Sequence, residues 1–285
     1  MARYLGAHMS IAGGLDQAPL RAQTIGINAV QIFVKSANQW KAKPLTPAEV
    51  DSFKKNVRAC GIDVIFGHDS YLINLAAPDP ANRTKSVDAF QVEMERSEAL
   101  GLSYLVMHPG SHTGSGEDAG IGRIIECFDQ IHAKTKGFKL KVLVETTAGQ
   151  GDNVGYRFEH IAQIIGGVKE KNRLGVCFDT CHVYAAGYNI KTEEGYKKVM
   201  EEFDAVIGLE NLCAFHLNDS KKGCGSRVDR HEHLGKGELG LAVFKCLMND
   251  KRFDRVPMVL ETPKSEDLHE DVENLKILRK LAAKA

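Results

Sequence analysis

Short apolar runs alternate along the chain with longer segments in which apolar residues recur at helical spacing. The short runs are typical of buried β-strands, and the longer segments are typical of helices that cover a sheet. We predict strands at Arg3–Ala7, Ala29–Val34, Asp63–His68, Tyr104–His108, Lys141–Glu145, Gly175–Asp179, Cys213–Leu217 and Pro257–Glu261. We predict helices at Gly14–Gly26, Pro47–Gly61, Arg83–Gly101, Glu117–Lys136, Phe158–Val168, Glu193–Gly208, Glu238–Asp250 and Leu268–Lys284.

The alternation of strand and helix predicts an α/β fold. Strands that are apolar almost throughout belong to a parallel sheet covered by helices. Units of this kind and number close into a (β/α)8 TIM barrel of roughly 250 residues, with its functional site at the C-terminal rim. A doubly wound open sheet is the competing architecture, but it would gather functional residues at one switch point. No Pro/Gly/Ser-rich linker interrupts the pattern, so we predict a single domain over residues 1–285.

The composition is that of an ordinary globular protein without an excess of either charge. Of the 285 residues, 43% are hydrophobic and 26% are charged, and Lys+Arg and Asp+Glu both number 37. A globally basic nucleic-acid binder is therefore excluded, although a local basic patch is not. No apolar run is long enough to span a bilayer. We expect a soluble cytoplasmic monomer without a membrane partner, associated with the nucleoid if the source is prokaryotic.

The seven cysteines are dispersed along the chain, and no CxxC pair occurs among them. Neither a thiolate zinc knuckle nor a disulfide framework is therefore expected. We interpret most of these residues as buried reduced thiols, because reduced cysteine behaves as a small hydrophobic residue.

Imidazole and carboxylate side chains gather at the ends of the predicted strands. From the third strand onward, each strand ends at or next to one of them: His68, His108, Glu145, Asp179, His216 and Glu261. Three more candidates lie in loops just beyond two of these strands: His182, Asp229 and His231. Each residue taken alone is more often structural. Because parallel strands of a barrel end at one rim, the joint pattern predicts a metal centre there.

The chemistry of these side chains favours zinc. A mixed imidazole and carboxylate set suits Zn²⁺, with Mn²⁺ as a substitute, whereas Mg²⁺ and Ca²⁺ prefer oxygen ligands alone. A single catalytic zinc takes about three protein ligands, so the candidate set is too large for one ion. About three zinc ions could share it, and their charge would exceed that of the four carboxylates by about +2. Such a net charge would attract a phosphodiester.

The remaining histidines and one glycine motif have simpler interpretations. We expect His132, His160 and His269 on helix surfaces and His233 exposed, with His8 and His112 near the rim as hydrogen-bonding partners of ligands. The segment Gly235–Gly240 matches GxGxxG. It follows a long irregular loop and not a strand, so it fails the context that dinucleotide binding requires. We interpret it as a tight loop before the next helix.

Several long segments resemble the endonuclease IV family. They are His68–Leu75, Gly175–His182, His216–Asp219, Gly225–His231 and Leu234–Gly237. That resemblance implies a (β/α)8 fold, a trinuclear zinc centre and damaged double-stranded DNA as the partner. The implied reaction hydrolyses the phosphodiester 5′ to an abasic site, leaving a 3′-hydroxyl and a 5′-deoxyribose phosphate. Removal of blocking groups from 3′ ends is implied as well.

The resemblance also implies roles for individual residues. His68, His108 and Glu145 would hold the first zinc, and Glu145 would bridge to a second zinc completed by Asp179, His216 and Glu261. His182, Asp229 and His231 would hold the third. Glu145 and Glu261 are the residues expected to matter most for catalysis.

Five residues are candidates for DNA contacts. Tyr71 and Leu72 follow His68 closely and could wedge into the gap left by a missing base. Arg227 and Arg230 lie in the long loop of residues 218–236 and could bind phosphates. Asn38 stands where well-known members of the resembled family carry an arginine that enters the minor groove.

Two alternatives stay open at this point. A metal-dependent sugar isomerase or epimerase on the same barrel would use a similar rim but fewer metals. A non-catalytic zinc-storing or DNA-binding protein would not need open coordination sites. A metal count would separate the first alternative from a nuclease, and nicking of abasic DNA would separate the second.

Overall fold

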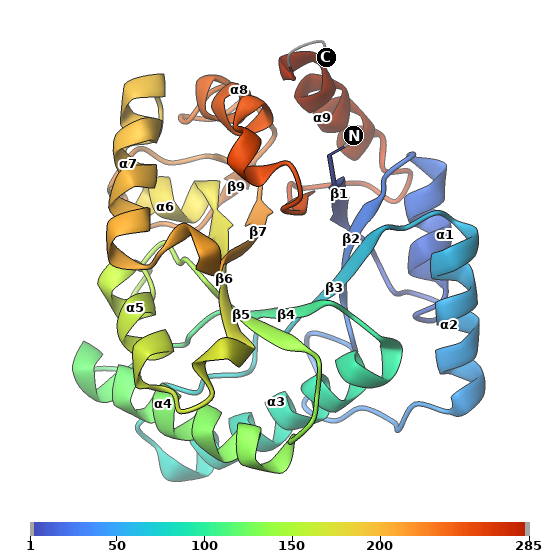
Figure 1. Ribbon diagram of the computed structural model, residues 1–285, viewed down its shortest axis with the longest axis vertical. Helices are drawn as coiled ribbons and strands as arrows, with labels where there is room; N and C mark the ends of the chain where they lie inside the picture. The colour runs from blue at the N-terminus through green and yellow to red at the C-terminus, as the bar shows by residue number, and fades with distance from the viewer. Residues whose placement is uncertain (1–2, 283–285) are drawn as a thin grey trace.

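The computed structural model describes residues 3–282. Within them, eight parallel strands close into a barrel in the order β1-β10-β7-β6-β5-β4-β3-β2 (Figure 1). The barrel strands are β1 (Leu5–His8), β2 (Ala29–Phe33), β3 (Val64–His68), β4 (Tyr104–Met107), β5 (Lys141–Glu145), β6 (Leu174–Asp179), β7 (Leu212–His216) and β10 (Met258–Leu260). This closed parallel barrel confirms the predicted (β/α)8 fold class. That the domain spans all of residues 1–285 stays a prediction.

The helices surround the barrel (Figure 1). Their bounds are α1 (Gln17–Thr24), α2 (Pro47–Ala59), α3 (Pro80–Leu100), α4 (Glu117–Lys134), α5 (Phe158–Gly167), α6 (Thr180–Ala186), α7 (Glu193–Val206), α8 (Ala242–Asn249) and α9 (His269–Leu281). Local sequence explains several ends. The Thr46 hydroxyl accepts from Glu49 N, and the Glu49 carboxylate accepts from Thr46 N, which forms a capping box at the start of α2. Helix α3 ends at Gly101, whose φ of 75° favours glycine.

Two hydrophobic layers hold the barrel together. The inside is filled by a compact cluster with one residue from each barrel strand except β1: Ala29, Phe66, Val106, Leu143, Cys177, Ala214 and Val259. A larger cluster fills the space between the strands and the surrounding helices. Because side chains fill the interior, as in other TIM barrels, chemistry is confined to the rim. Strand register aligns the rim: Asp179 pairs with His216 across β6 and β7, and Phe33 pairs with His68 across β2 and β3.

Most predicted elements match the structure within a few residues, but three regions differ. Helix α6 follows β6 directly, with Asp179 as its N-cap, where we predicted a loop. The predicted loop of residues 218–236 contains an antiparallel hairpin, β8 (Asp219–Ser220) and β9 (His231–Glu232). Helix α8 begins at Ala242, after Gly235–Gly240. The residue Lys284, at the end of the last predicted helix, lies outside the described residues.

The glycine-rich segment has a structural role. The Asp219 carboxylate is buried and accepts hydrogen bonds from the backbone N–H groups of Gly235, Gly237, Leu239 and Gly240. At Gly237 an added Cβ would come within 2.4 Å of Ser220 O and 2.5 Å of Asp219 Oδ1. Glycine is therefore needed there so that the backbone can wrap closely around the carboxylate.

Some predictions of burial were wrong. His132 and His160 are buried, with exposed fractions of 2% and 1%, because the faces of α4 and α5 that carry them turn toward neighbouring elements. His269 is exposed as predicted, whereas His233 is only half-exposed and contacts Asn274. Of the cysteines, three are buried, three are partly buried, and Cys224 is exposed, so the prediction that most are buried was too general.

Among residues 3–282, no helix has the length and apolar character that crossing a membrane requires.

Candidate metal centre

The strand-borne candidate ligands form an arc along the rim. His68, Glu145, Asp179 and His216 are the last residues of β3, β5, β6 and β7, and His108 and Glu261 follow β4 and β10 by one residue. These six strands are consecutive neighbours in the closed barrel. A parallel arrangement brings all their C-terminal ends to the same side, so the six side chains converge.

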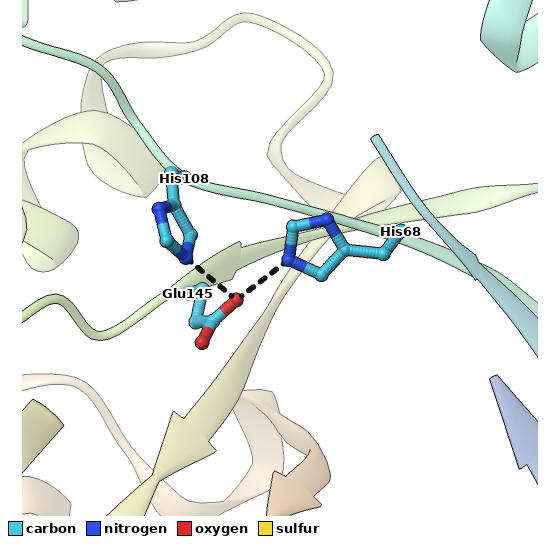
Figure 2. Close-up of side chains that lie close together, drawn as sticks. All are labelled: His68, His108 and Glu145. Carbon is cyan, nitrogen blue, oxygen red and sulfur yellow. Dashed lines mark hydrogen bonds and ion pairs between the residues drawn. The ribbon is translucent and has the colours of Figure 1, made fainter. Parts of the chain in front are cut away.

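Glu145 lies at the centre of this arc. Its Oε2 lies 3.1 Å from His68 Nε2 and 3.3 Å from His108 Nε2, and Figure 2 shows both rings pointing at that oxygen. Its Oε1 lies 3.0 Å from His216 Nδ1 and 3.1 Å from His182 Nδ1. The two oxygens of one buried carboxylate therefore serve different sets of imidazoles, which is the arrangement of a bridging ligand.

A second set of ligand atoms lies beside Glu145. His216 Nδ1 is 3.1 Å from Glu261 Oε2 and 3.7 Å from Asp179 Oδ2. One ligand atom from each of Glu145, Asp179, His216 and Glu261 lies within 4.8 Å of the others. We call these residues the second group, and His68, His108 and Glu145 the first group. Both groups have the residue types and spacing of a site that could hold a metal ion.

The third group is His182, Asp229 and His231. Asp229 Oδ1 lies 3.1 Å from His182 Nε2 and 3.5 Å from His231 Nε2. His182 is carried by α6, and His231 is the first residue of β9, so this group depends on the elements that the sequence did not predict. The structure thus brings together all nine candidate ligands in three groups that could hold metal ions. The identity and number of those ions stay predictions.

Hydrogen bonds at one ring nitrogen orient four of the five candidate imidazole ligands. His68 Nδ1 donates to Asp69 O at 2.9 Å, and His182 Nδ1 donates to Thr146 O at 2.9 Å. His216 Nε2 donates to Gln31 Oε1 at 2.7 Å, and His231 Nδ1 donates to Glu261 O at 3.3 Å. In each ring the other nitrogen faces the carboxylates, where it could ligate a metal ion after losing its proton. This pattern is typical of metal-bound histidine and fits the donor set to zinc.

Two supporting residues were missed by the sequence analysis. Gln31, fully buried on β2, contacts His8, His216 and Glu261 through its amide. Asn218 donates from Nδ2 to Asp179 Oδ2 at 2.7 Å and accepts from Glu261 N at 2.9 Å. A polar amide inside the apolar run Ala29–Val34 was the available signal for Gln31. The contact of His8 with Gln31 agrees with its expected supporting role, whereas His112 binds Gly116 N, away from the three groups.

The electrostatics of the centre reflect dense pairing of buried charges. Burial lowers the pKa of His68, but the hydrogen bond and the charge of Glu145 more than offset this effect and raise that pKa to about 10. Burial raises the pKa of Glu145, but the charges of His216 and His108 hold it well below its usual range. The pKa of Asp229 is likewise lowered, because the charge of His182 outweighs the effect of burial. These paired imidazoles and carboxylates therefore favour the binding of cations, and a metal ion that binds displaces the protons that the imidazoles carry.

The centre opens into a pocket of about 380 Å³. Ligand side chains form its floor, and Tyr71, Lys221, Arg230 and Pro263 line its walls. Of the candidate DNA contacts, Asn38, Tyr71, Arg227 and Arg230 are exposed, and Leu72 is partly buried. The guanidinium of Arg227 lies 4.3 Å from the centre of the Tyr156 ring, so part of its cationic face is already used within the protein.

Comparison with known proteins agrees with this geometry. Residues 19–281 match the family described as xylose isomerase-like TIM barrels. The protein named "Probable endonuclease 4" from Geobacter sulfurreducens is 52% identical over 98% of this chain and 94% of its own length. Its counterpart from Trichlorobacter lovleyi is 53% identical over 99% of this chain and 100% of its own.

Solved structures give the same picture. Endonuclease IV from Thermus thermophilus superposes with a TM-score of 0.86 at 37% identity, covering 98% of both chains. A D-tagatose 3-epimerase-like protein superposes with a TM-score of 0.75 at 17% identity, covering 98% of this chain and 96% of its own. The second likeness shows only that the fold is shared.

Proposed function

This chain belongs to the endonuclease IV family of xylose isomerase-like TIM barrels, and from that membership we propose that it is a DNA repair endonuclease acting at abasic sites. The proposed reaction is hydrolysis of the phosphodiester 5′ to the abasic nucleotide, which leaves a 3′-hydroxyl and a 5′-deoxyribose phosphate. Removal of blocking groups from 3′ ends is proposed as a second activity of the same site. We expect the protein to act as a monomer.

The observation that carries this proposal is the third ligand group beside the first two. An isomerase that binds a sugar through one metal has no need of His182, Asp229 and His231 around a further position. About three zinc ions held by three groups would place a net positive charge at the floor of the pocket, where a phosphodiester must bind. His68, His108 and Glu145 would hold one ion, the second group another, and the third group the last.

Zinc ions, when bound, supply Lewis acidity and positive charge that activate water and offset the charge of a phosphodiester in its transition state. The chain's own residues prepare the site for that chemistry. Glu145, buried between four imidazoles, fixes the relative positions of the first two groups. The Gln31 amide and the backbone N–H of Glu261, which donates to Asn218, hold the Glu261 side chain at the pocket.

The walls of the pocket would bind the substrate. Lys221 and Arg230 line it and can contact the phosphate oxygens. The side chain of Tyr71 is 69% exposed, and its ring packs edge-on against Phe33 at 5.4 Å, so it is supported from below while its outer face stays free. Such a ring can occupy the gap left by a missing base, where stacking has already been lost.

The test compares a duplex containing one abasic site with the same duplex intact. We expect a single cut 5′ to the abasic site, a 3′ end that a polymerase can extend, and no cut in the intact duplex. Prolonged chelation should abolish the reaction, and added zinc should restore it. Elemental analysis should give about three zinc ions per chain. Full nuclease activity with about one or two metals would overturn the trinuclear centre, and failure to cut abasic DNA would overturn the function.

A further inference from the structure

The two loops proposed to meet DNA touch each other. We define the β2 loop as residues 34–46, which contains Asn38, and the β3 loop as residues 69–79, which contains Tyr71 and Leu72. The Ser70 hydroxyl of the β3 loop donates to Ala37 O of the β2 loop at 2.6 Å, next to Asn38. The two loops come from neighbouring strands, β2 and β3, which pair in register up to Phe33 and His68.

A buried ion pair lies beneath this contact. Lys35 Nζ is 3.0 Å from Glu93 Oε1 on α3, and the two side chains are 3% and 1% exposed. The same ammonium donates to Gln39 O in the β2 loop at 2.6 Å. The Glu93 carboxylate accepts from Ser70 N in the β3 loop at 3.1 Å. Lys35 therefore holds the β2 loop, and Glu93 holds the β3 loop. Because Glu93 lies on α3, the ion pair also joins both loops to that helix.

Other support for the β2 loop comes from Trp40, which packs against the hydrophobic core and whose ring centre lies 4.0 Å from the Lys85 ammonium. A pocket of about 680 Å³ lies on its far side, between it and the loop that follows β1, lined in part by Gly13, Lys35 and Gln39. At the ends of the loop, Arg96 of α3 donates to Val34 O at 2.8 Å and to Lys43 O at 2.7 Å. Its middle, around Asn38, is held by Lys35 and Ser70. Packing of Trp40 therefore anchors the loop after Asn38, and the hydrogen bonds of Lys35 and Ser70 hold the residues on either side of Asn38.

A fully buried ion pair is an expensive way to add stability, because both charges lose their hydration. Apolar side chains of similar size would fill the same space at lower cost. Unlike apolar side chains, the charged groups of the ion pair also make hydrogen bonds of defined geometry to their partners. The ion pair lies between the β2 and β3 loops. This location indicates that its main contribution is to fix the positions of these loops and not to stabilise the fold.

We propose that Lys35 and Glu93 are positioning residues that couple the β2 and β3 loops, so that Asn38 and Tyr71 engage DNA as one unit. This inference rests on the proposed function. Neither side chain lines the pocket over the metal centre or belongs to the three ligand groups, so the effect is on DNA binding. Loss of the coupling should weaken the binding of abasic DNA and leave the chemical step unchanged.

The decisive variant is the double substitution Lys35→Met with Glu93→Gln. It removes both charges together, so neither is left buried without a partner, and the new amide keeps an oxygen for Ser70 N. We expect KM and Kd for the abasic duplex to rise about tenfold while kcat at saturating DNA stays within about twofold. Zinc content should be normal. Unchanged KM, or a fall in kcat equal to the fall in kcat/KM, would overturn the proposal.

A mutant cycle with Tyr71→Ala tests the coupling itself. If the loops act as one unit, Tyr71→Ala should cost at least about threefold less binding in the double variant than in the wild type. Equal losses in the two backgrounds would show that the loops act independently. Ser70→Ala removes the hydrogen bond between the loops and the longer one, at 3.3 Å, that the hydroxyl accepts from Leu72 N, and it should shift KM in the same direction by a smaller factor. It provides the test if the double variant does not fold.

Two further measurements separate this proposal from its premise. Tyr196→Phe breaks a partly buried hydrogen bond between α7 and Asp250, the residue that follows α8, and should leave KM unchanged. Hydrogen exchange of the free protein should become faster at residues 36–40 in the double variant, whatever the substrate is; unchanged exchange would refute the coupling. If the wild-type protein did not bind abasic DNA, the proposed function would fail, and the exchange result would still decide whether the pair holds the loops.

Discussion

The second and third ligand groups use the same kinds of side chain but differ in what carries them. Glu145, Asp179 and His216 end barrel strands and are fully buried, and Glu261 follows a strand and is 18% exposed. In the third group, Asp229 is 37% exposed and His231 is 16% exposed, and both lie in the long segment after β7. Hydrogen bonds of the closed sheet hold the second group, whereas the fold of one loop holds most of the third.

Local support for the third group comes from loops and two short strands outside the barrel sheet. Asp229 N donates to the side chain of Gln150 at 3.0 Å, and the hairpin of β8 and β9 has two residues in each strand. Segments with few buried contacts open at lower free energy than the core does. Ligands of the same chemical type can therefore differ in how firmly they retain a metal ion, because retention depends on the stability of the segment that carries them.

The largest effect is expected at the residue shared by the first and second groups. Glu145→Gln should lower turnover by about a thousandfold or more, because it removes a charge and a ligand from two metal positions together. Glu261→Gln should act in the same direction but less strongly, because Glu261 belongs to the second group alone. Abasic DNA should still bind to both variants. Single-turnover rates, with binding measured in parallel, give the result, and near-normal turnover in either variant would refute its role.

The third group should be the first to lose its metal. Asp229→Asn should reduce zinc content by about one ion and turnover by about a hundredfold, while the other ions stay bound. In the wild type, timed chelation should release that ion before the rest. If elemental analysis found the strand-borne ions leaving first, or all ions leaving together, the stability of the carrying segment would not govern retention of the metal.

A histidine far from the rim shows what the carboxylates contribute. His132 is as buried as His68, but burial and the charge of Arg173 lower its pKa to about 4, whereas Glu145 raises that of His68. Between pH 6.5 and 4 the unfolded chain binds a proton at His132 that the folded protein does not bind. This residue therefore contributes stability at neutral pH that is lost as the pH falls.

His132→Phe, with a ring of similar size, should remove about 2 kcal/mol of the stability lost between about pH 7 and about pH 4.5. Denaturant titrations of wild type and variant at both pH values measure the difference. His269→Gln, at an exposed histidine, serves as the control. If the variant loses as much stability as the wild type on acidification, His132 is not the group that titrates.

The smallest effect is expected outside the metal centre. Asn38 is exposed and uncharged. Asn38→Arg should tighten binding of the abasic duplex about threefold and steepen its dependence on salt by about one ion, as one added phosphate contact would. The chemical step should hardly change. Binding titrations across a salt series decide the matter, and an unchanged slope would mean that the β2 loop does not enter the groove.

Burial was the property that short-range pattern predicted least well. His132 and His160 lie on helices and were predicted to be surface residues of those helices. The structure turns them inward: His160 accepts from Gly155 N at 3.2 Å and lies 3.2 Å from Glu117. Gly155 lies just before α5, but Glu117 begins α4, and its position relative to α5 depends on the packing of the barrel. No local pattern carries that information.

The sequence by itself determined the barrel and its candidate ligands. Apolar runs of strand length, each followed by a helix, can bury their surfaces only in a covered parallel sheet, and the sheet then brings the ends of its strands together. His68, Glu145 and His216 could therefore be placed at one rim from their position in the chain alone.

Tertiary structure decided which groups support and join these ligands. Gln31 reaches His216 and Glu261 only because closure of the barrel brings β2 near β7 and β10. Lys35 meets Glu93 only because α3 packs beneath two loops. Such contacts join residues far apart in the sequence, and their geometry arises when the barrel closes. The pattern of apolar and polar residues determines that closure, but the side chains that meet as a result are determined by the packing of the whole molecule.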